Sequence, residues 1–170
     1  SLDIINFHIL YWSTSPDLHN SLIAQSISRN VFDDIMSRLH FTDNMQNSED
    51  RYFKVRPIFD ILNKLFKVLD NPKHLSIDET IVPYYGKHGT KQFIRGKLIR
   101  FGFKLWSLCT ADGHMVHSEP YCGSSTNLET SGKGQGYDVV SGLLKKAEIQ
   151  KGSHIIFDNY FTSIDLLSDL

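Results

Sequence analysis

The sequence predicts a mixed α/β protein in which a helical segment, residues 1–73, precedes an incomplete sheet-containing domain, residues 74–170. Two changes of pattern support this prediction. Apolar residues recur at helical spacing as far as about residue 70, and from Leu75 onward they alternate with polar residues as they do in a strand. A short apolar run at residues 154–157 indicates a further strand between two helical stretches.

The first segment is predicted to contain three helices. Pro16 and Asp17 suit the first turn of a helix, because proline lacks only an N–H that would be unpaired there and aspartate favours the positive helix end. Asn30 can cap a second helix. Pro57 opens a third with one apolar face, and Asn71-Pro72 ends it, because the residue before a proline disfavours the α conformation.

The second segment is predicted to begin with three antiparallel strands. Residues 75–81 form the first, residues 101–110 the second and residues 115–121 the third, and Asp112-Gly113 makes the hairpin turn between the last two. A helix over residues 137–148 follows. Residues 154–157 are expected to form a strand buried on both faces, and Thr162 or Ser163 is expected to cap a last helix.

The predicted order from residue 75 is therefore β-β-β-α-β-α. A meander followed by a right-handed crossover to a parallel strand fits this order. It is also the opening part of an RNase H-like fold, here truncated. A likeness of fold raises an expectation about function but does not establish one.

Composition excludes several classes of protein. Hydrophobic residues make up 41% of the chain and charged residues 22%, so a core can form and wholesale disorder is excluded. No apolar run approaches the roughly 18 residues of a bilayer span, and no leader peptide is visible. The two cysteines, Cys109 and Cys122, are too few for a disulfide scaffold and lack metal-finger spacing. A reduced, intracellular protein is therefore expected. The chain begins at Ser1 and stops at Leu170 inside a predicted helix, which suggests a piece of a longer protein.

Positive charge is concentrated in one part of the chain. The formal net charge is −1, yet 12 of the 18 lysines and arginines lie between Arg51 and Lys104, with only four acids. The densest part, which we name the basic strip, contains no acid and consists of Lys87, Lys91, Arg95, Lys97, Arg100 and Lys104. Aromatic residues interleave with these cations, a combination that suits nucleic acid because bases stack while cations meet phosphates. The alternative is an ordinary solvated loop.

Two aspartates are candidates for chemistry. Asp78 lies within the first predicted strand, on the face opposite Leu75 and Ile77, and Asp158 follows directly on the strand 154–157. If these strands are neighbours, the two carboxylates face one another, and divalent cations relieve the repulsion of such a pair. The alternative is a strand-edge charge at Asp78 and a turn residue at Asp158.

Other candidates are weaker. His114 and His117 would point to opposite faces of a strand, so a shared metal is not expected. Gly132, Gly134 and Gly136 precede a helix and could cradle a phosphate. They lack a preceding strand and a Lys-Ser/Thr pair, which favours a flexible loop.

Several strings resemble the piggyBac transposase family, and especially host-encoded proteins derived from piggyBac elements. In the second segment they are LSIDETIVPYYGK (75–87), KQFIRGK (91–97), RFGFKLW (100–106) and FDNYFTS (157–163). Upstream they include ISRNVF (27–32) and LHFTDN (39–44), which resemble the helical segment that the family places before its catalytic core. The similarity covers nearly the whole chain in order.

The resemblance implies a fold, a chemistry and partners. It implies an RNase H-like domain whose three aspartates bind two divalent metals, usually Mg²⁺ with Mn²⁺ as a substitute. The first two acids fall on Asp78 and Asp158, and the basic strip falls where the family has cations near DNA. Cleavage at element ends, strand transfer by a 3′-hydroxyl, a TTAA target, a homodimer and a nuclear location are also implied.

The resemblance also implies what this chain lacks. The family's third acid lies well beyond the second, whereas twelve residues follow Asp158 here, and Asp165 and Asp169 are poor substitutes. We therefore expect these 170 residues alone neither to cleave nor to join DNA. A domesticated or decayed, non-catalytic DNA-binding or interaction protein is the alternative, and shared descent gives it the same two aspartates.

Overall fold

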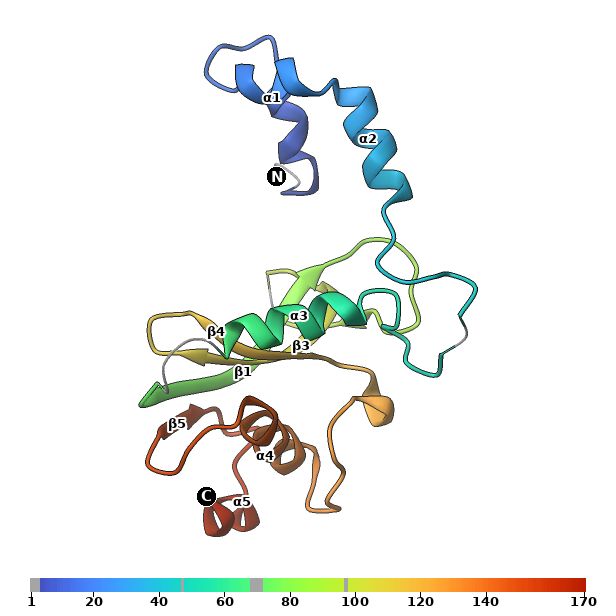
Figure 1. The fold of residues 1–170 in the computed structure, drawn as a ribbon. Helices are drawn as coiled ribbons and strands as arrows, with labels where there is room; N and C mark the ends of the chain where they lie inside the picture. Colours follow the sequence, from blue (N-terminus) through green and yellow to red (C-terminus); the bar gives the residue numbers. More distant parts are fainter. Residues whose placement is uncertain (1–3, 47, 68–71, 97) are drawn as a thin grey trace. The chain divides into compact units, whose positions relative to one another are not determined.

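The computed structural model describes residues 4–46, 48–67, 72–96 and 98–170, and the chain divides into two compact units at Phe41 and Thr42 (Figure 1). None of the helices among these residues is long and apolar enough to cross a membrane. The predicted division at residue 73 stays a prediction, because compactness alone does not define a functional segment. The predicted helix end at Asn71 and Lys97 of the basic strip lie outside the described residues.

The first unit is helical, as its sequence predicts. It contains a 3-10 helix, Ile4–Trp12, and the helices α1, Ser21–Ser26, and α2, Arg29–Arg38. The Trp12 indole N–H donates to the Ile27 carbonyl oxygen at 2.8 Å, and the Trp12 ring packs on Phe32 with 5.5 Å between centroids. These contacts join the 3-10 helix to both α1 and α2.

Two predicted helix starts in this unit are wrong. Pro16 and Asp17 lie in a turn closed by the Leu18 N–H and the Ser15 carbonyl oxygen, and α1 begins later because the Asn20 side chain accepts the Ile23 N–H. Similarly, Ser28 rather than Asn30 caps α2, accepting the Val31 N–H. In both cases a better-placed capping side chain determines where the helix begins.

The second unit is built on a mixed five-stranded sheet. Strand order is β2-β3-β1-β5, and β4 also pairs with β3. Neighbours are antiparallel except β1 and β5, which are parallel. The strands are β1 (His74–Pro83), β2 (Gln92–Phe93), β3 (Phe101–Thr110), β4 (Met115–Pro120) and β5 (His154–Phe157). The helices are α3 (Arg56–Phe66), α4 (Gln135–Ala147) and α5 (Ile164–Asp169), with a short 3-10 helix at Gly123–Ser125.

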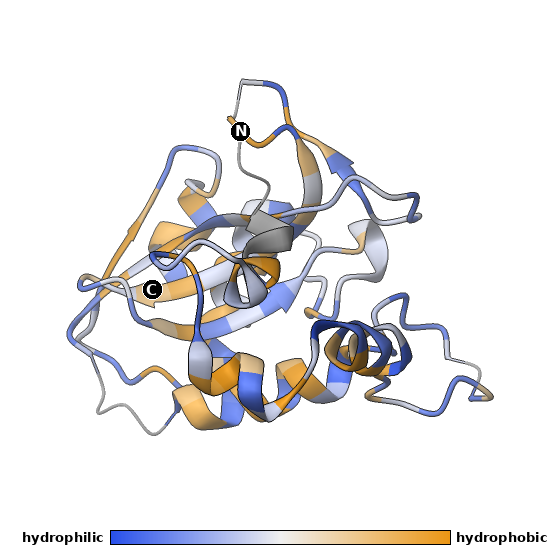
Figure 2. Ribbon diagram, turned by 90° about the horizontal axis from the view of Figure 1, so that it is seen from above, coloured by the Kyte–Doolittle hydropathy of each residue, from blue (hydrophilic) through white to orange (hydrophobic). Residues whose placement is uncertain are grey.

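The helices form two layers around this sheet. Figure 1 shows α3 on one face and α4 and α5 on the other. The hydropathy colouring of Figure 2 shows apolar and polar segments alternating along the helices and strands. The main core lies on the α4 face, where Ile77, Leu108 and Trp106 from the sheet meet Val140 and Leu143 from α4. Alternation along β1 therefore leaves the side chain of Asp78 on the α3 face.

Polar contacts attach α3 to the sheet. The Glu119 carboxylate, which is buried at the end of β4, binds the Arg56 guanidinium at 2.7 Å and the Lys146 ammonium at 2.8 Å. The Asn63 side chain both donates to the Ser118 carbonyl oxygen and accepts the Ser118 N–H. A buried carboxylate needs such partners because burial of an unpaired charge is costly.

The strand predictions are confirmed in most respects. Strands β1, β3, β4 and β5 lie where alternation and the apolar run predict them, the turn uses Gly113 at a φ of +85°, and β1 neighbours β5 in parallel. One prediction is wrong, because strand β5 is not buried on both faces: Ile156 is 66% exposed. The two-residue strand β2, which lies between the first two predicted strands, was not predicted.

Candidate catalytic and nucleic-acid site

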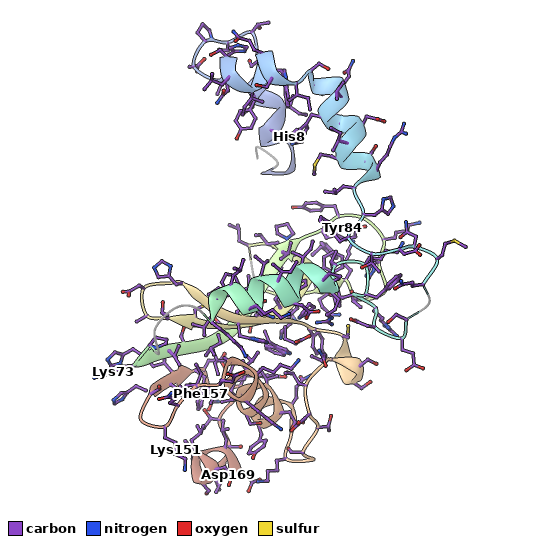
Figure 3. All side chains as sticks on the ribbon, viewed as in Figure 1. His8, Lys73, Tyr84, Lys151, Phe157 and Asp169 are labelled. Atoms are coloured by element: carbon purple, nitrogen blue, oxygen red, sulfur yellow. The ribbon has the colours of Figure 1, made fainter. Side chains whose placement is uncertain are left out.

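The parallel pairing of β1 with β5 brings Asp78 and Asp158 to adjacent segments of the chain. The register pairs Ile77 with Phe157, and each aspartate follows one residue later. Neighbouring strands lie about 4.8 Å apart, so the two aspartates begin side by side although they lie far apart in the sequence. Both are exposed. Figure 3 labels Phe157, which directly precedes Asp158.

The surroundings of Asp78 are polar. Its Oδ1 atom accepts the Glu79 N–H at 2.7 Å, and Ser107 lies directly opposite it on β3. Burial raises the pKa of the Cys109 thiol, and the negative charge of Asp78 raises that pKa further. Cys109 is paired with Ser76, so it lies diagonally across the strand pair from Asp78 on the same face.

The surroundings of Asp158 form a tight turn. Its Oδ1 atom accepts the Tyr160 N–H at 2.9 Å, and its carbonyl oxygen accepts the Phe161 N–H at 3.2 Å. The Phe161 ring is fully buried and therefore anchors the turn to the core. The backbone of α4 meets this turn at Gly136, where a Cβ atom would lie 2.8 Å from both Phe161 Cα and the Tyr160 carbonyl oxygen. The glycine that the sequence assigns to a flexible loop thus permits close backbone contact.

These two carboxylates fit part of a divalent-cation site. Both supply hard oxygen ligands, and Mg²⁺ commonly uses one or two protein carboxylates together with waters and phosphates. Among the residues that the structure describes, no three His, Cys, Asp or Glu side chains gather as a ready-made metal site. Asp169 has other partners, because its Oδ2 atom binds the Lys133 ammonium at 2.6 Å and accepts the Tyr137 hydroxyl at 2.7 Å.

Much of the basic strip forms a hairpin that extends the sheet. Phe93 on β2 pairs with Phe101 on β3, and the Ile94 N–H donates to the Arg100 carbonyl oxygen at 2.8 Å. Lys87, Arg95 and Arg100 are exposed. We name residues 87–101 the basic hairpin. A pocket of about 320 Å³ at its base is lined by Gly86, Lys87, His88, Lys91, Gln92, Phe93 and Phe101.

The other described members of the strip are differently engaged. The Lys91 ammonium donates to the Gly86 carbonyl oxygen at 2.9 Å and lies 5.1 Å from the centroid of Phe101. The Lys104 ammonium lies on the α4 face, 3.8 Å from the centroid of Trp106. The period of two along β3 could have predicted this position, because Lys104 shares a face with Trp106 and Leu108.

The aromatic residues of this region divide into inward and outward sets. Tyr84 packs on Phe103 with 4.7 Å between centroids, and Tyr52, which sequence analysis missed, packs edge-on to Phe103 at 5.9 Å. Phe93 is 60% exposed and Phe101 42%, and their centroids lie 5.0 Å apart. The outward pair is therefore available for stacking.

The basic hairpin and the aspartates lie at different places along the sheet. Pro83, which pairs with Gly102 next to the basic hairpin, lies five residue steps beyond Asp78 along β1. At about 3.4 Å per residue this is a separation of about 17 Å. In Figure 3, Tyr84 next to the hairpin is accordingly well separated from Phe157.

Comparison with known proteins gives the class and then the family. A family model described as "Transposase IS4" matches residues 8–170, nearly the entire chain. With the relatives and the solved structure described next, this match shows that the chain belongs to the piggyBac-type transposases of that family.

Two human relatives are similar over almost the whole chain. PiggyBac transposable element-derived protein 3 is 39% identical over 165 residues, and protein 2 of the same name series is 36% identical over 166 residues. Each alignment covers 95% of this chain and 28% of the relative. The chain thus spans less than a third of the length of these relatives.

A solved structure is also similar. It is a cryo-EM structure of a piggyBac transposase synaptic complex with hairpin DNA, and it superposes with a TM-score of 0.80 at 27% sequence identity. The similarity covers 89% of this chain and 32% of that one. The mixed α/β architecture is therefore shared with a piggyBac transposase.

Proposed function

We propose that this chain contributes two of three catalytic carboxylates to a piggyBac-like transposase core with an RNase H-like arrangement. In the longer protein, that core cleaves DNA strands at element ends and transfers them. The observation that carries this proposal is the position of Asp78 and Asp158, one residue beyond a registered pair on parallel neighbouring strands. The solved relative in complex with hairpin DNA supports the choice of substrate.

Asp78 and Asp158 are the residues that would hold Mg²⁺ or Mn²⁺. When bound, such a cation supplies Lewis-acid stabilisation of the charge that develops on phosphodiester oxygens. The two aspartates would provide its ligands on the protein side, and their fixed strand register limits how far they can separate. A third acid is expected to lie well beyond Asp158 in the family's pattern, so a two-metal site is proposed for the longer protein alone.

The basic hairpin is proposed to hold DNA at a distance from the cleavage site. A separation of about 17 Å along the sheet corresponds to roughly five base pairs at 3.4 Å each. Arg95, Arg100 and Lys87 would therefore contact flanking phosphates and set the position of the duplex. A TTAA target, a homodimer and a nuclear location complete the proposal, and these three rest on the family resemblance.

Metal binding by the chain tests this function. We would titrate Mn²⁺ and follow free Mn²⁺ by electron paramagnetic resonance, with and without a short DNA duplex. Asp78→Asn and Asp158→Asn should each weaken Mn²⁺ binding by at least about tenfold, because even outer-shell changes can have that effect. Asp112→Asn removes a carboxylate at the β3–β4 turn and should leave binding unchanged.

Two results would contradict this proposal or part of it. Equal Mn²⁺ affinity in the wild-type chain and both aspartate variants would exclude a metal site at Asp78 and Asp158. Mn²⁺-dependent nicking of DNA by the 170 residues, abolished by Asp78→Asn, would overturn the expectation that the chain alone is inactive.

The second candidate function is a domesticated, non-catalytic DNA-binding protein. The names of the human relatives, which describe transposable element-derived proteins, favour it. DNA binding that depends on the basic hairpin but not on Mn²⁺ or either aspartate would support this function over the first.

A further inference from the structure

The Asp158 carboxylate owes its orientation to the turn that follows it. The turn is closed by hydrogen bonds from the Tyr160 N–H to Asp158 Oδ1 and from the Phe161 N–H to the Asp158 carbonyl oxygen. The Thr162 hydroxyl also donates to that carbonyl oxygen, at 3.3 Å. Any movement of Tyr160 therefore moves a donor that contacts the carboxylate directly.

The Tyr160 side chain contacts two aromatic rings and a side-chain amide, although the residue is 53% exposed. It stacks on Trp106 with 6.0 Å between centroids and an interplanar angle of 21°, and it meets Phe161 edge-on at 5.1 Å. Its hydroxyl donates to Gln135 Oε1 at the start of α4. A strand and a helix together thus fix the residue that contacts Asp158.

A cation completes this aromatic cluster. The Lys104 ammonium lies 3.8 Å from the centroid of Trp106 and 5.6 Å from those of Tyr121 and Tyr160. An ammonium over aromatic faces is attracted by their negative quadrupole. We name Lys104, Trp106, Tyr121 and Tyr160 the Lys104 cage.

An acidic residue of β1 shares the face of the cage. Glu79 is paired with Trp106 across β1 and β3, so its side chain shares the face of the cage. The ammonium of Lys104 therefore lies on the face of the sheet that also carries the Glu79 side chain.

We infer that the Lys104 cage is a positioning device for the metal ligand Asp158. It fixes Tyr160, and the Tyr160 N–H in turn holds the Asp158 carboxylate in the orientation that binds a divalent cation. The inference rests on the proposed function, because it presupposes a cation at Asp78 and Asp158. Lys104, Trp106 and Tyr160 are positioning residues here, since they act through the turn.

This role differs in its consequences from a phosphate contact. A lysine that binds DNA affects DNA affinity and its dependence on salt, whereas a positioning lysine affects cation binding when no DNA is present. Metal affinity without DNA therefore distinguishes the two roles.

The test compares Mn²⁺ affinity among matched variants of the chain without DNA, at a temperature well below their melting transitions. Lys104→Met and Tyr160→Leu remove the cation and the ring, and each should weaken Mn²⁺ binding by about tenfold, as outer-shell changes do. Lys104→Arg retains the cation and Tyr160→Phe retains the ring, so both should restore binding to within about twofold of wild type. Lys133→Met is the control, because that lysine lies 4.7 Å from the Tyr137 centroid, in another cluster.

The outcomes separate this inference from the proposed function. If Asp158→Asn weakens Mn²⁺ binding while Lys104→Met and Tyr160→Leu do not, the positioning role is overturned and the proposed metal site is supported. If Asp158→Asn has no effect, the result contradicts both the metal site and the positioning role. Should Tyr160→Leu not fold, Lys104→Met decides alone, since its side chain is partly exposed. Lower melting temperatures without rescue by the conservative variants would indicate a purely structural role and overturn the inference.

Discussion

His117 is a buried titratable residue with a predictable effect on stability. It is 5% exposed on β4, and neither ring nitrogen has a hydrogen-bond partner among the described residues. Burial lowers its pKa from 6.5 to about 4, and the charges of Lys146 and Lys67 act in the same direction. The neutral imidazole is therefore favoured in the folded chain.

The pH dependence follows from this difference in pKa. Below pH 6.5 the unfolded chain binds a proton at His117 that the folded chain binds only near pH 4. Unfolding free energy should therefore fall by about 2 kcal/mol between pH 7 and pH 5 through this residue alone. Urea denaturation of His117→Phe should show this fall removed, while the exposed His114→Phe should retain it. Equal pH profiles for wild type and His117→Phe would contradict the assignment.

Gly136 gives a second prediction at the scale of one residue. In Gly136→Ala the new methyl group meets the backbone of Tyr160 and Phe161 at 2.8 Å, which cannot yield as a side chain would. We expect a loss of about 2 kcal/mol in unfolding free energy, as for other overpacked sites. Gly142→Ala on the same helix meets the movable Leu128 side chain and gains helix propensity, so urea denaturation should show little change. Similar stability losses in the two variants would refute this account.

Residue-scale predictions from the sequence succeeded where a local rule had no competitor. Gly113 takes the positive φ that the Asp-Gly turn requires. For α5, Thr162 and Ser163 were both candidates for the cap, and Ser163 is the cap. The starts of α1 and α2 were missed because Asn20 and Ser28 offer better-placed side-chain acceptors than the residues chosen. Contact between Gly136 and the turn after Asp158 depends on the packing of α4. No local sequence pattern predicts this packing.

The basic hairpin carries a prediction at the scale of an element. Arg100→Gln should weaken duplex DNA binding and reduce the slope of log affinity against log salt by about 1, because one phosphate contact is lost. Lys151→Gln removes the same charge from the exposed loop before β5 and should leave the slope unchanged. Fluorescence anisotropy between 50 and 200 mM salt is the suitable measurement. An equal slope in wild type and Arg100→Gln would exclude this hairpin as a DNA contact.

Element-scale predictions depended on the hydrophobic period. Alternation located β1, whose Leu75 and Ile77 face the core, whereas β3 and β4 have consecutive buried residues and no pattern detected the two-residue β2. The apolar run of β5 was interpreted as burial on both faces. Yet α4 and α5 lie on one face of the sheet and α3, which contacts β4, lies on the other, and Ile156 on that second face is 66% exposed.

The division of the chain gives a prediction for the whole molecule. The contacts of Asp78, Asp158 and the Lys104 cage described above all lie within residues 42–170. A chain that starts at Thr42 should therefore bind Mn²⁺ with the affinity of all 170 residues, within about twofold. A loss of affinity beyond that range would show that residues 1–41 contribute to the site. Circular dichroism of the shorter chain would first establish that the sheet is intact.

At this largest scale the sequence predicted the topology of the β1–β5 pairing but not the environment of the site. A meander followed by a crossover leaves few arrangements, so the neighbouring positions of Asp78 and Asp158 could be deduced. The Lys104 cage could not, because Tyr121 and Tyr160 belong to separate loops that meet only through tertiary packing.

The parallel pairing of β1 with β5 has a consequence for the order in which this protein folds. Strands β3 and β4 are joined by a tight turn and can associate quickly, whereas β1 and β5 must close a loop of about eighty residues. The two carboxylates therefore converge in one of the last steps. Under the proposed function, a newly made chain therefore acquires both proposed cation ligands only when its sheet is complete, so cation uptake would report the end of folding.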